Sequence, residues 1–243
     1  MKSLIFTIAQ NGYGFAYSRC IASQAAYAKA IGAEFVVVNK PMRVAESALS
    51  AWLKIPLLKS ALNAGWDSVA YIDADCEVKG GAPHFSLPLQ QSGSSNVHMA
   101  LGRSGRVNSG VMLAQPTESS IGFLERVMQS ITEAIPDDDR RDLKFENGNV
   151  IYVNRILEPV GPLATEWNNT FDPDLPDFIR HYTGVLRAEY RQSAAFSLTN
   201  KILRKTVFRQ PPQPPSRDDA FVSRLERLTG QVLLQEAAFR RAK

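Results

Sequence analysis

Two aspartates separated by one residue follow an apolar run: the stretch "DSVAYIDADCEV" spans residues 67–78 and contains Asp73 and Asp75. Side chains at positions i and i+2 of an extended strand point to the same face. Two carboxylates on the same face of a strand are close enough to repel each other. They destabilise the fold unless a cation lies between them. Hard oxygen ligands of this kind suit Mg²⁺ or Mn²⁺, which commonly link protein carboxylates to the phosphates of a substrate. The stretch therefore predicts a divalent-metal site.

The residues before this acidic pair alternate between strand and helix patterns. Apolar runs at 3–9 and 34–38 predict strands, and helical spacing is seen at 19–32 and at 49–65, where Pro56 starts a new segment or kinks the helix. The β-α-β-α-β order predicts an α/β fold with a mainly parallel sheet flanked by helices. Because ligands of such sheets bind beyond the carboxyl ends of the strands, the acidic pair is expected at the binding edge.

The second half of the chain gives less regular signals. Residues 80–96 are rich in Gly, Ser and Pro and predict a surface excursion. Thr117 is expected to cap the helix that follows it. The other predicted elements are two strands at 97–102 and 110–115, helices at 118–135 and 146–157, and a last strand at 178–184.

The chain is predicted to divide into an α/β domain over residues 1–192 and a basic helical extension over 193–243, with a stiff Pro-rich linker at 210–216. Residues 179–243 contain 13 Lys and Arg against 5 Asp and Glu, a net charge of +8, which leaves 15 against 19, or −4, for the preceding part. The extension could attract phosphates, anionic lipid or nucleic acid, or be an ordinary solvated surface. Its last helix carries an apolar stripe that is expected to pack on the main domain: Phe221, Leu225, Leu228 and Val232.

Composition favours a globular protein, with 44% apolar and 21% charged residues. No run reaches the roughly 18 apolar residues that a membrane span needs, and the first residues read as a strand rather than a signal peptide. The two cysteines, Cys20 and Cys76, give no disulfide framework and suit a reducing compartment, so a cytoplasmic location is expected, with peripheral membrane contact as a further possibility. Cys76 is interpreted as a small buried apolar residue rather than a nucleophile.

Five blocks of sequence, in order, resemble the retaining glycosyltransferases of GT-A fold. The similar groups are the glycogenin-like family and the family of galactomannan galactosyltransferases and xyloglucan xylosyltransferases. The blocks are "AAYAKAIGAEF" (25–35), "AWLKIPLLKSALNAGWDSVAYIDADCEV" (51–78), "VNSGVML" (107–113), "FENGNVIY" (145–152) and "HYTGVLR" (181–187). The resemblance implies a GT-A-like (Rossmann-like) domain. It also implies metal-dependent transfer of a hexose or pentose from a UDP-sugar to an acceptor hydroxyl, with retention of configuration.

The resemblance assigns the metal to three side chains. Asp75 and His181 would bind it directly, and Asp73 would contact it or the ribose. An imidazole beside carboxylates favours Mn²⁺ over Mg²⁺. Gly184 would let the backbone approach the diphosphate, and Arg187 stands where the family has a lysine, which exchanges a point charge for a planar fork. The alternative for His181 is an interior histidine satisfied by hydrogen bonds.

The donor sugar is expected to meet a second group of residues. Asn108 and Ser109 would line its pocket, and Glu146 and Asn147 would lie near the anomeric carbon. Asn147 replaces the family's glutamine and is one methylene shorter, so an ordinary first helical turn is the alternative for this pair. "ATEWNN" (164–169) resembles a Trp-Asn stretch of the glycogenin group.

The nucleotide base is expected near Ala9, Gln10 and Tyr13, in the loop after the first strand. The acceptor, a glycan, a lipid-linked glycan or a protein, is left open, and no nucleic-acid recognition module is present. Two other functions stay open. One is a nucleotide-sugar-binding protein without turnover. The other is a phosphatase of the haloacid dehalogenase type with Asp73 as nucleophile, although Glu77 stands where that class has Thr or Val.

Overall fold

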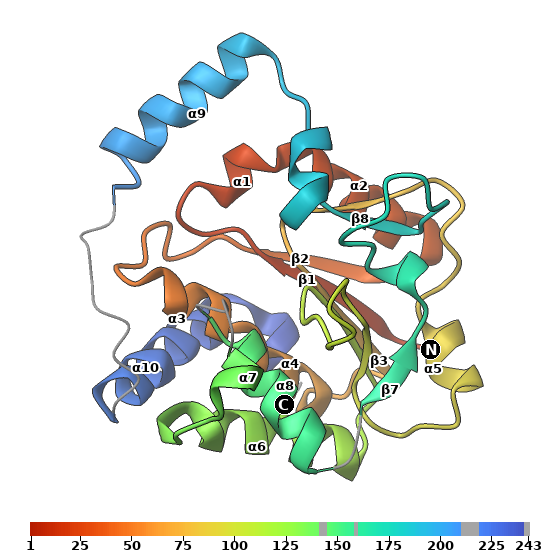
Figure 1. Ribbon diagram of the computed structural model, residues 1–243. Helices are drawn as coiled ribbons and strands as arrows, with labels where there is room; N and C mark the ends of the chain where they lie inside the picture. The colour runs from red at the N-terminus through yellow and green to blue at the C-terminus, as the bar shows by residue number, and fades with distance from the viewer. Residues whose placement is uncertain (141–144, 158–159, 210–218, 241–243) are drawn as a thin grey trace.

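A six-stranded sheet forms the centre of the protein. The computed structural model describes residues 1–140, 145–157, 160–209 and 219–240 (Figure 1). In this part of the chain the strands follow the order β2-β1-β3-β6-β5-β7 across the sheet. Their bounds are β1 Ser3–Ile8, β2 Glu34–Val38, β3 Ser68–Ile72, β5 His98–Ala100, β6 Val111–Ala114 and β7 Gly161–Leu163.

The sheet is mostly parallel, as predicted. β1 pairs in parallel with β2 and with β3, and β5 pairs in parallel with β7. β6 runs antiparallel to its neighbours β3 and β5. The β7 strand was not predicted, because its three residues, Gly161–Leu163, include a proline and carry no alternating pattern.

A separate two-stranded sheet is formed by β4 (Cys76–Val78) and β8 (Ile179–His181). The last predicted strand is therefore real but shorter than residues 178–184, and it does not join the central sheet. The two strands are antiparallel, and Cys76 lies opposite His181. This pairing brings a histidine from late in the chain next to the acidic pair.

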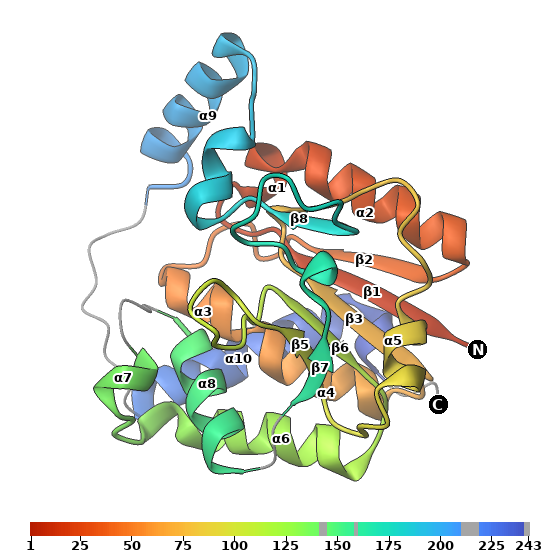
Figure 2. The ribbon, with the colours of Figure 1, turned by 45° about the vertical axis from the view of Figure 1, so that its right-hand side comes forward.

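Helices cover both faces of the central sheet (Figures 1 and 2). The helix predicted at 49–65 is two helices that meet at Leu53, with Pro56 in the first turn of the second. Thr117 caps α6 as predicted, its side chain accepting from the Ser120 backbone N–H at 3.1 Å. The excursion at 80–96 contains a short helix, α5, that was not predicted. The α-helices are α1 Tyr13–Ala16, α2 Ser18–Ile31, α3 Ser47–Trp52, α4 Lys54–Asn63, α5 Ser86–Gln91, α6 Glu118–Gln129, α7 Asp137–Arg140, α8 Asn147–Ile156, α9 Ala194–Thr206 and α10 Asp219–Gln235.

Alternation along β1 divides the core into two clusters. Leu4, Phe6 and Ile8 pack with residues of α3, α4, α6, α8 and α10 on one face of the sheet. Ile5 packs on the other face with Tyr27 of α2 and with residues of β4 and β8. Because both faces are covered, the central strands are apolar throughout, which is why they were recognised from the sequence.

The two C-terminal helices differ in their packing. The α10 stripe is buried in the same cluster as β1, as predicted, and the ring of Phe239 lies edge-on to Phe6 with centroids 5.2 Å apart. No residue of α9 is buried, and this helix stands away from the body in Figures 1 and 2. The predicted linker at 210–216 lies outside the described residues. None of the described helices has the length and apolar character required to cross a membrane.

Candidate active site

The predicted site residues gather at one edge of the central sheet. The carboxyl ends of β1, β2 and β3 meet there, since these strands are parallel. β6 is antiparallel to β3, so its amino end and the turn before it lie at the same edge. A hydrogen bond from the Asp73 backbone N–H to the Gly110 carbonyl, 2.7 Å long, joins the two strand ends.

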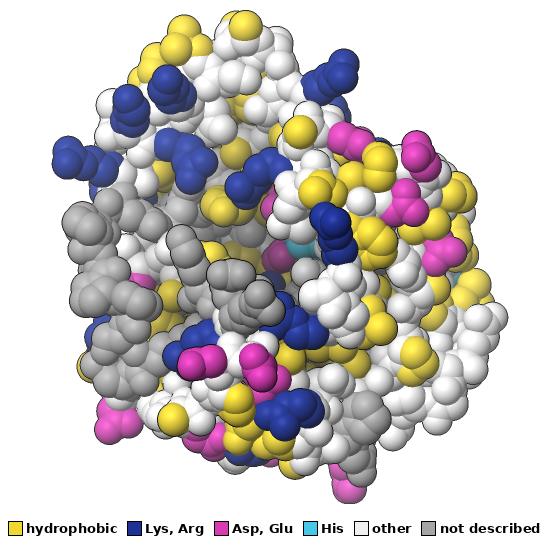
Figure 3. Space-filling model, in the orientation of Figure 1, with side chains coloured by type: hydrophobic (Ala, Val, Ile, Leu, Met, Phe, Trp, Pro, Cys, Tyr) yellow, Lys and Arg dark blue, Asp and Glu magenta, His cyan; other side chains and the backbone are white. Residues whose placement is uncertain are grey.

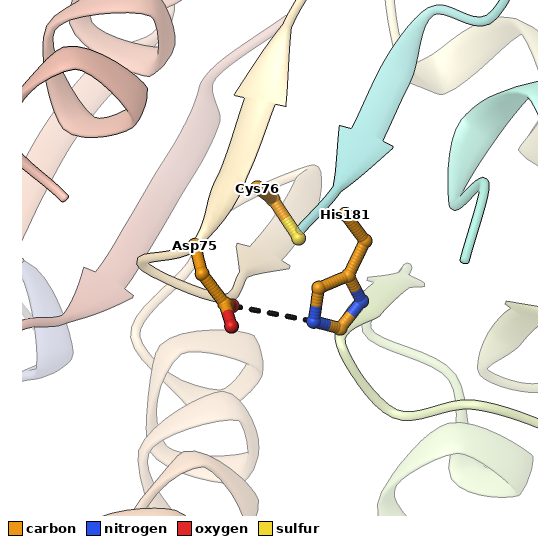
Figure 4. A group of neighbouring side chains, drawn as sticks. All are labelled: Asp75, Cys76 and His181. Carbon is orange, nitrogen blue, oxygen red and sulfur yellow. Dashed lines mark ion pairs between the residues drawn. The ribbon is translucent and has the colours of Figure 1, made fainter. Parts of the chain in front are cut away.

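The imidazole of His181 faces both aspartates. Its Nε2 atom lies 3.2 Å from Oδ1 of Asp75 and 3.8 Å from Oδ2 of Asp73 (Figure 4 shows the Asp75 pair). Burial and the neighbouring Asp75 raise the pKa of Asp73. Burial alone would raise the pKa of Asp75 too, but the His181 ring outweighs it and lowers that pKa. Burial opposes the charge of His181, yet the two carboxylates raise the pKa of its ring.

Hydrogen bonds and a glycine fix the orientation of the His181 ring. Its Nδ1 atom lies 3.0 Å from Oδ1 of Asn168, and the Asn168 amide nitrogen donates to Oδ1 of Asn108 at 2.9 Å. The Asn168 oxygen therefore accepts from Nδ1–H, which leaves the Nε2 lone pair of the neutral ring facing the aspartates. A Cβ atom at Gly110 would lie only 2.3 Å from Cε1 of His181, so glycine makes room for the ring. Asn168 belongs to the Trp-Asn stretch, but no role was predicted for it.

These donors fit a divalent ion. Two ligand atoms that each lie about 2.1 Å from one ion at right angles are roughly 3 Å apart, which is close to the 3.2 Å that separates Asp75 Oδ1 from His181 Nε2. A histidine ligand is typically oriented by a hydrogen bond from its other ring nitrogen, the arrangement that Asn168 supplies. The cluster of ligand atoms within 4.8 Å of one another comprises Asp75, Cys76 and His181.

A buried lysine that sequence reasoning missed connects the two halves of the site. The Lys54 ammonium lies 3.2 Å from Oδ1 of Asp73 and 2.8 Å from Oε1 of Glu146, and it donates to the Ser109 carbonyl at 3.3 Å. The Tyr71 hydroxyl donates to the same Asp73 oxygen. The signal was available, because Lys54 interrupts an apolar stretch at the start of α4, and a buried lysine is rarely found without partners.

Glu146 immediately precedes α8 and Asn147 is its first residue, and both side chains contact the turn before β6. Oε1 of Glu146 accepts from the Ser109 hydroxyl at 2.9 Å, and Oδ1 of Asn147 accepts from the Ser109 backbone N–H at 2.9 Å. The Asn147 amide nitrogen donates to the Val107 carbonyl at 3.2 Å. Both polar atoms of the Asn147 side chain thus hydrogen-bond the turn that carries Asn108. The structure therefore gives Asn147 a role in stabilising that turn, called its bracing role below.

The three residues assigned to the base differ in accessibility. Ala9 is buried, and its backbone N–H donates to Val38. Gln10 is buried as well, with Nε2 donating to the Lys40 carbonyl at 3.2 Å and Oε1 accepting from Ser50 at 2.9 Å. Tyr13 is 41% exposed, and burial of the hydroxyl, with Asp75 next in size, raises its pKa. Of these three, only Tyr13 has an exposed side chain.

Gly184 and Arg187 lie in a 3₁₀ turn, Gly184–Glu189, which directly follows β8. Gly184 has φ of 48°, a left-handed conformation that favours glycine. Leu186 is buried and anchors the turn, whereas Arg187 is exposed and hydrogen-bonds the Tyr17 hydroxyl. The turn therefore places the Arg187 guanidinium at the edge of the site, on the side of Tyr13 and Tyr17.

The surface is hollowed where these elements meet. Figure 3 shows carboxylate and histidine side chains at the bottom of this hollow, with Lys and Arg side chains on both of its sides. Because cations surround a core of carboxylates, the arrangement can attract a polyanion while holding a metal ion beneath it.

The sequence matches no protein-family model and no curated protein. The fold, in contrast, is similar to solved structures of glycosyltransferases. One is a glycosyltransferase involved in glycosylation of the major capsid of PBCV-1, with a TM-score of 0.57 and 15% identity over 83% of this chain and 100% of that chain. Another is the glycosyltransferase GlyE of Streptococcus pneumoniae TIGR4, with a TM-score of 0.50 and 13% identity over 88% of this chain and 66% of that one. The chain thus has a GT-A-like glycosyltransferase fold.

Proposed function

We propose that the protein transfers a sugar from a nucleotide diphosphate sugar, a UDP-sugar, to an acceptor hydroxyl, in a reaction that depends on Mn²⁺ or Mg²⁺. The observation that carries the proposal is the convergence of Asp73, Asp75 and His181 at the binding edge of a glycosyltransferase fold. Carboxylates of an ordinary exposed turn would not be partly buried around one oriented imidazole nitrogen, whereas the side chains of Asp73 and Asp75 are only 26% and 13% exposed.

Asp75 and His181 would hold the ion, and Asp73 would contact it or the ribose. The ion, when bound, supplies Lewis acidity to the diphosphate that leaves the sugar. The protein's own contribution is orientation and charge balance. Asn168 fixes the His181 ring, and Lys54 offsets part of the charge of Asp73.

The cations and polar groups around the hollow suit the rest of the donor. Arg187 would contact the diphosphate, with the Gly184 backbone close by, and the ring of Tyr13 would lie against the base. Glu146, Asn108 and Ser109 border the space next to Asp73 and would meet the sugar. The Glu146 carboxylate is already bonded to Lys54 and Ser109, which suits a group that orients hydroxyls.

Retention of configuration is part of the proposal. The acceptor would attack on the face from which the diphosphate departs, and a departing phosphate oxygen would take the acceptor proton. Such a path requires no separate general base. It is compatible with the position of Glu146, whose Oε1 atom faces an ammonium group 2.8 Å away.

The test is incubation with a panel of UDP-sugars, with and without Mn²⁺, followed by measurement of released UDP. The proposal predicts release, by hydrolysis when no acceptor is present, that chelation abolishes and Mn²⁺ restores. UDP binding without release from any donor would favour a binding protein, an alternative to which the bracing role of Asn147 lends some weight. Phosphate release without dependence on UDP, with Asp73 phosphorylated, would identify a phosphatase.

We further propose that α9 places the site against an anionic membrane that carries a lipid-linked acceptor. Leu198 and Ile202 are 60% and 51% exposed on one side of the helix, and exposed cations flank them: Lys201, Arg204 and Lys205. The ring of Phe196 stacks on Phe15 with centroids 4.4 Å apart, which fixes α9 to α1 at the rim of the site. Such an amphipathic helix binds membranes through its apolar residues and its cations.

The membrane contact is tested with the double variant Leu198→Ser/Ile202→Ser in sedimentation with vesicles rich in phosphatidylserine. Binding should weaken at least about tenfold, because each buried apolar side chain contributes roughly 1.5 kcal/mol or more. Leu234→Ser on α10 is the control, since this leucine is 77% exposed on another helix. Equal binding by all three proteins would exclude α9 as the contact. Deletion of 197–243 is unsuitable, because it removes α10 from the core.

A further inference from the structure

Cys76 lies within the candidate metal cluster. The residue is opposite His181 in the β4–β8 pair, so the two side chains share one face of that small sheet. Its Sγ atom, an oxygen of Asp75 and a ring nitrogen of His181 all lie within 4.8 Å of one another (Figure 4). The residue is fully buried.

The thiol has a weak hydrogen bond where it stands. Its Sγ atom is 3.9 Å from the Gly110 carbonyl, near the outer limit for a sulfur donor. Burial and the carboxylates of Asp75 and Asp73 raise the pKa of the Cys76 thiol, so the thiolate that binds a metal would form only as the metal displaces the thiol proton. The same geometry therefore permits a donor set that the acidic pair alone does not suggest.

We propose that the Cys76 thiolate ligates the metal together with Asp75 and His181, so that this site also takes borderline-soft ions such as Zn²⁺ and Co²⁺ beside the Mn²⁺ or Mg²⁺ of the proposed reaction. The inference rests on the metal site of the proposed function and specifies its ligands. Thiolate, imidazole and carboxylate are the three ligand types that Zn²⁺ uses in proteins, and soft sulfur favours Zn²⁺ over Mn²⁺. The Cys76 thiol transfers its proton to solvent as the metal–sulfur bond forms.

The distances are compatible with this donor set. In a tetrahedral zinc site the sulfur lies about 2.3 Å and the nitrogen about 2.0 Å from the ion, so the two donors are roughly 3.5 Å apart. The separation of at most 4.8 Å requires an approach of at most about 1.3 Å. Rotation of the Asp75 and Cys76 side chains could supply that approach, since β4 begins at Cys76 and Asp75 lies just outside the strand.

Cobalt gives a readout that does not depend on turnover. Under reducing conditions, Co²⁺ added to the full chain should produce the near-ultraviolet charge-transfer absorption that arises when thiolate binds Co²⁺. Cys76→Ser should lose this absorption, and its affinity for Zn²⁺ should fall at least about tenfold. Cys20→Ser is the matched control, because Cys20 is the other buried cysteine of the chain and lies outside the cluster. It should keep the absorption.

Other outcomes separate the two proposals. Co²⁺ binding without the charge-transfer absorption would overturn Cys76 as a ligand and leave the metal site standing. Loss of the absorption in Cys20→Ser rather than in Cys76→Ser would overturn it too. Failure of the wild-type chain to bind Co²⁺, Zn²⁺ or Mn²⁺ would overturn the metal site itself. Should Cys76→Ser not fold, X-ray absorption of the zinc-loaded wild-type protein decides, with sulfur expected at about 2.3 Å from the ion.

Discussion

The ammonium group of Lys54 lies 2.8 Å from the carboxylate of Glu146, and each side chain is only 4% exposed. Burial by itself would lower the pKa of Lys54, but the adjacent Asp73 and Glu146 outweigh it and raise that pKa. One buried cation therefore faces two carboxylates from different elements. It ties the start of α4 to the end of β3 and to the residue before α8, three segments that surround the expected donor sugar.

Lys54→Met should destabilise the protein by about 3–5 kcal/mol, because removal of one partner leaves buried carboxylates without a counter-charge. Urea unfolding, followed by circular dichroism, measures the change. The double variant Lys54→Met/Glu146→Gln should recover part of the loss, since Glu146 then carries no charge to be compensated. If the loss of unfolding free energy in the double variant equals the sum of the losses in the two single variants, the two residues do not interact and the pairing is wrong.

Gly110→Ala should weaken the binding of Mn²⁺ by about 10- to 100-fold, the range seen when partners of metal ligands are disturbed. The added Cβ would lie 2.3 Å from Cε1 and 2.6 Å from Nδ1 of His181, so the ring must turn away from Asp75. Isothermal titration with Mn²⁺ measures the affinity.

Gly102→Ala is the matched control for that substitution. Gly102 follows β5, and the nearest atom to its added Cβ is Oγ1 of Thr170 at 3.6 Å, an ordinary contact. Neither Gly102 nor Gly110 has a positive φ, so backbone strain does not separate the two variants. Equal affinities for Mn²⁺ in both variants would mean that the His181 ring is not a ligand.

Patterns of apolar residues were sufficient for the central elements. β1, β2 and β3 are continuous apolar runs, and the apolar residues of α10 repeat at helical spacing. The local sequence of these elements is therefore enough to predict which residues are buried. β7 and α5 were missed because they are short and contain proline, and what places them is contact with distant residues.

The site could be anticipated where residue type implies chemistry or where a block resembles a known family. Asp73 and Asp75 were selected because of their type and spacing, and His181 because "HYTGVLR" resembles a family motif; the structure does bring the three together. The roles of Lys54 and Asn168 depend on partners far away in the chain, which no local pattern contains. For the same reason the hydrogen bonds of the Gln10 side chain with Lys40 and Ser50 were not foreseeable.

Asp75→Ala should abolish Mn²⁺-dependent release of UDP while the protein stays folded. The substitution removes a proposed metal ligand and also relieves the repulsion that, together with burial, raises the pKa of Asp73. Circular dichroism and UDP release are the two measurements, and Glu118→Gln, which alters an exposed carboxylate at the start of α6, is the control. Near-normal turnover by Asp75→Ala would refute its role as a metal ligand.

The stability of the metal-free protein should decrease as the pH rises above about 6.5. The folded state raises the pKa of His181 from its usual 6.5, so the contribution of the His181–Asp75 pair is complete below that value and is lost as the pH rises through the folded pKa. The pKa values of His84 and His98 are lowered, chiefly by burial, so their contributions change only below 6.5 and do not affect this window.

Unfolding by urea at a series of pH values, with a chelator present, measures this dependence. The slope should not exceed about 1.4 kcal/mol per pH unit, the value for one proton. His181→Gln should remove the slope, because no titrating ring remains between the aspartates. With Mn²⁺ in place of the chelator the trend should reverse, since metal and proton compete for Nε2 and metal binding strengthens as the proton leaves. If the stability of His181→Gln still decreases with pH over this range, the titrating proton belongs to another group. The proposed interaction of the His181 ring with the acidic pair would then be wrong.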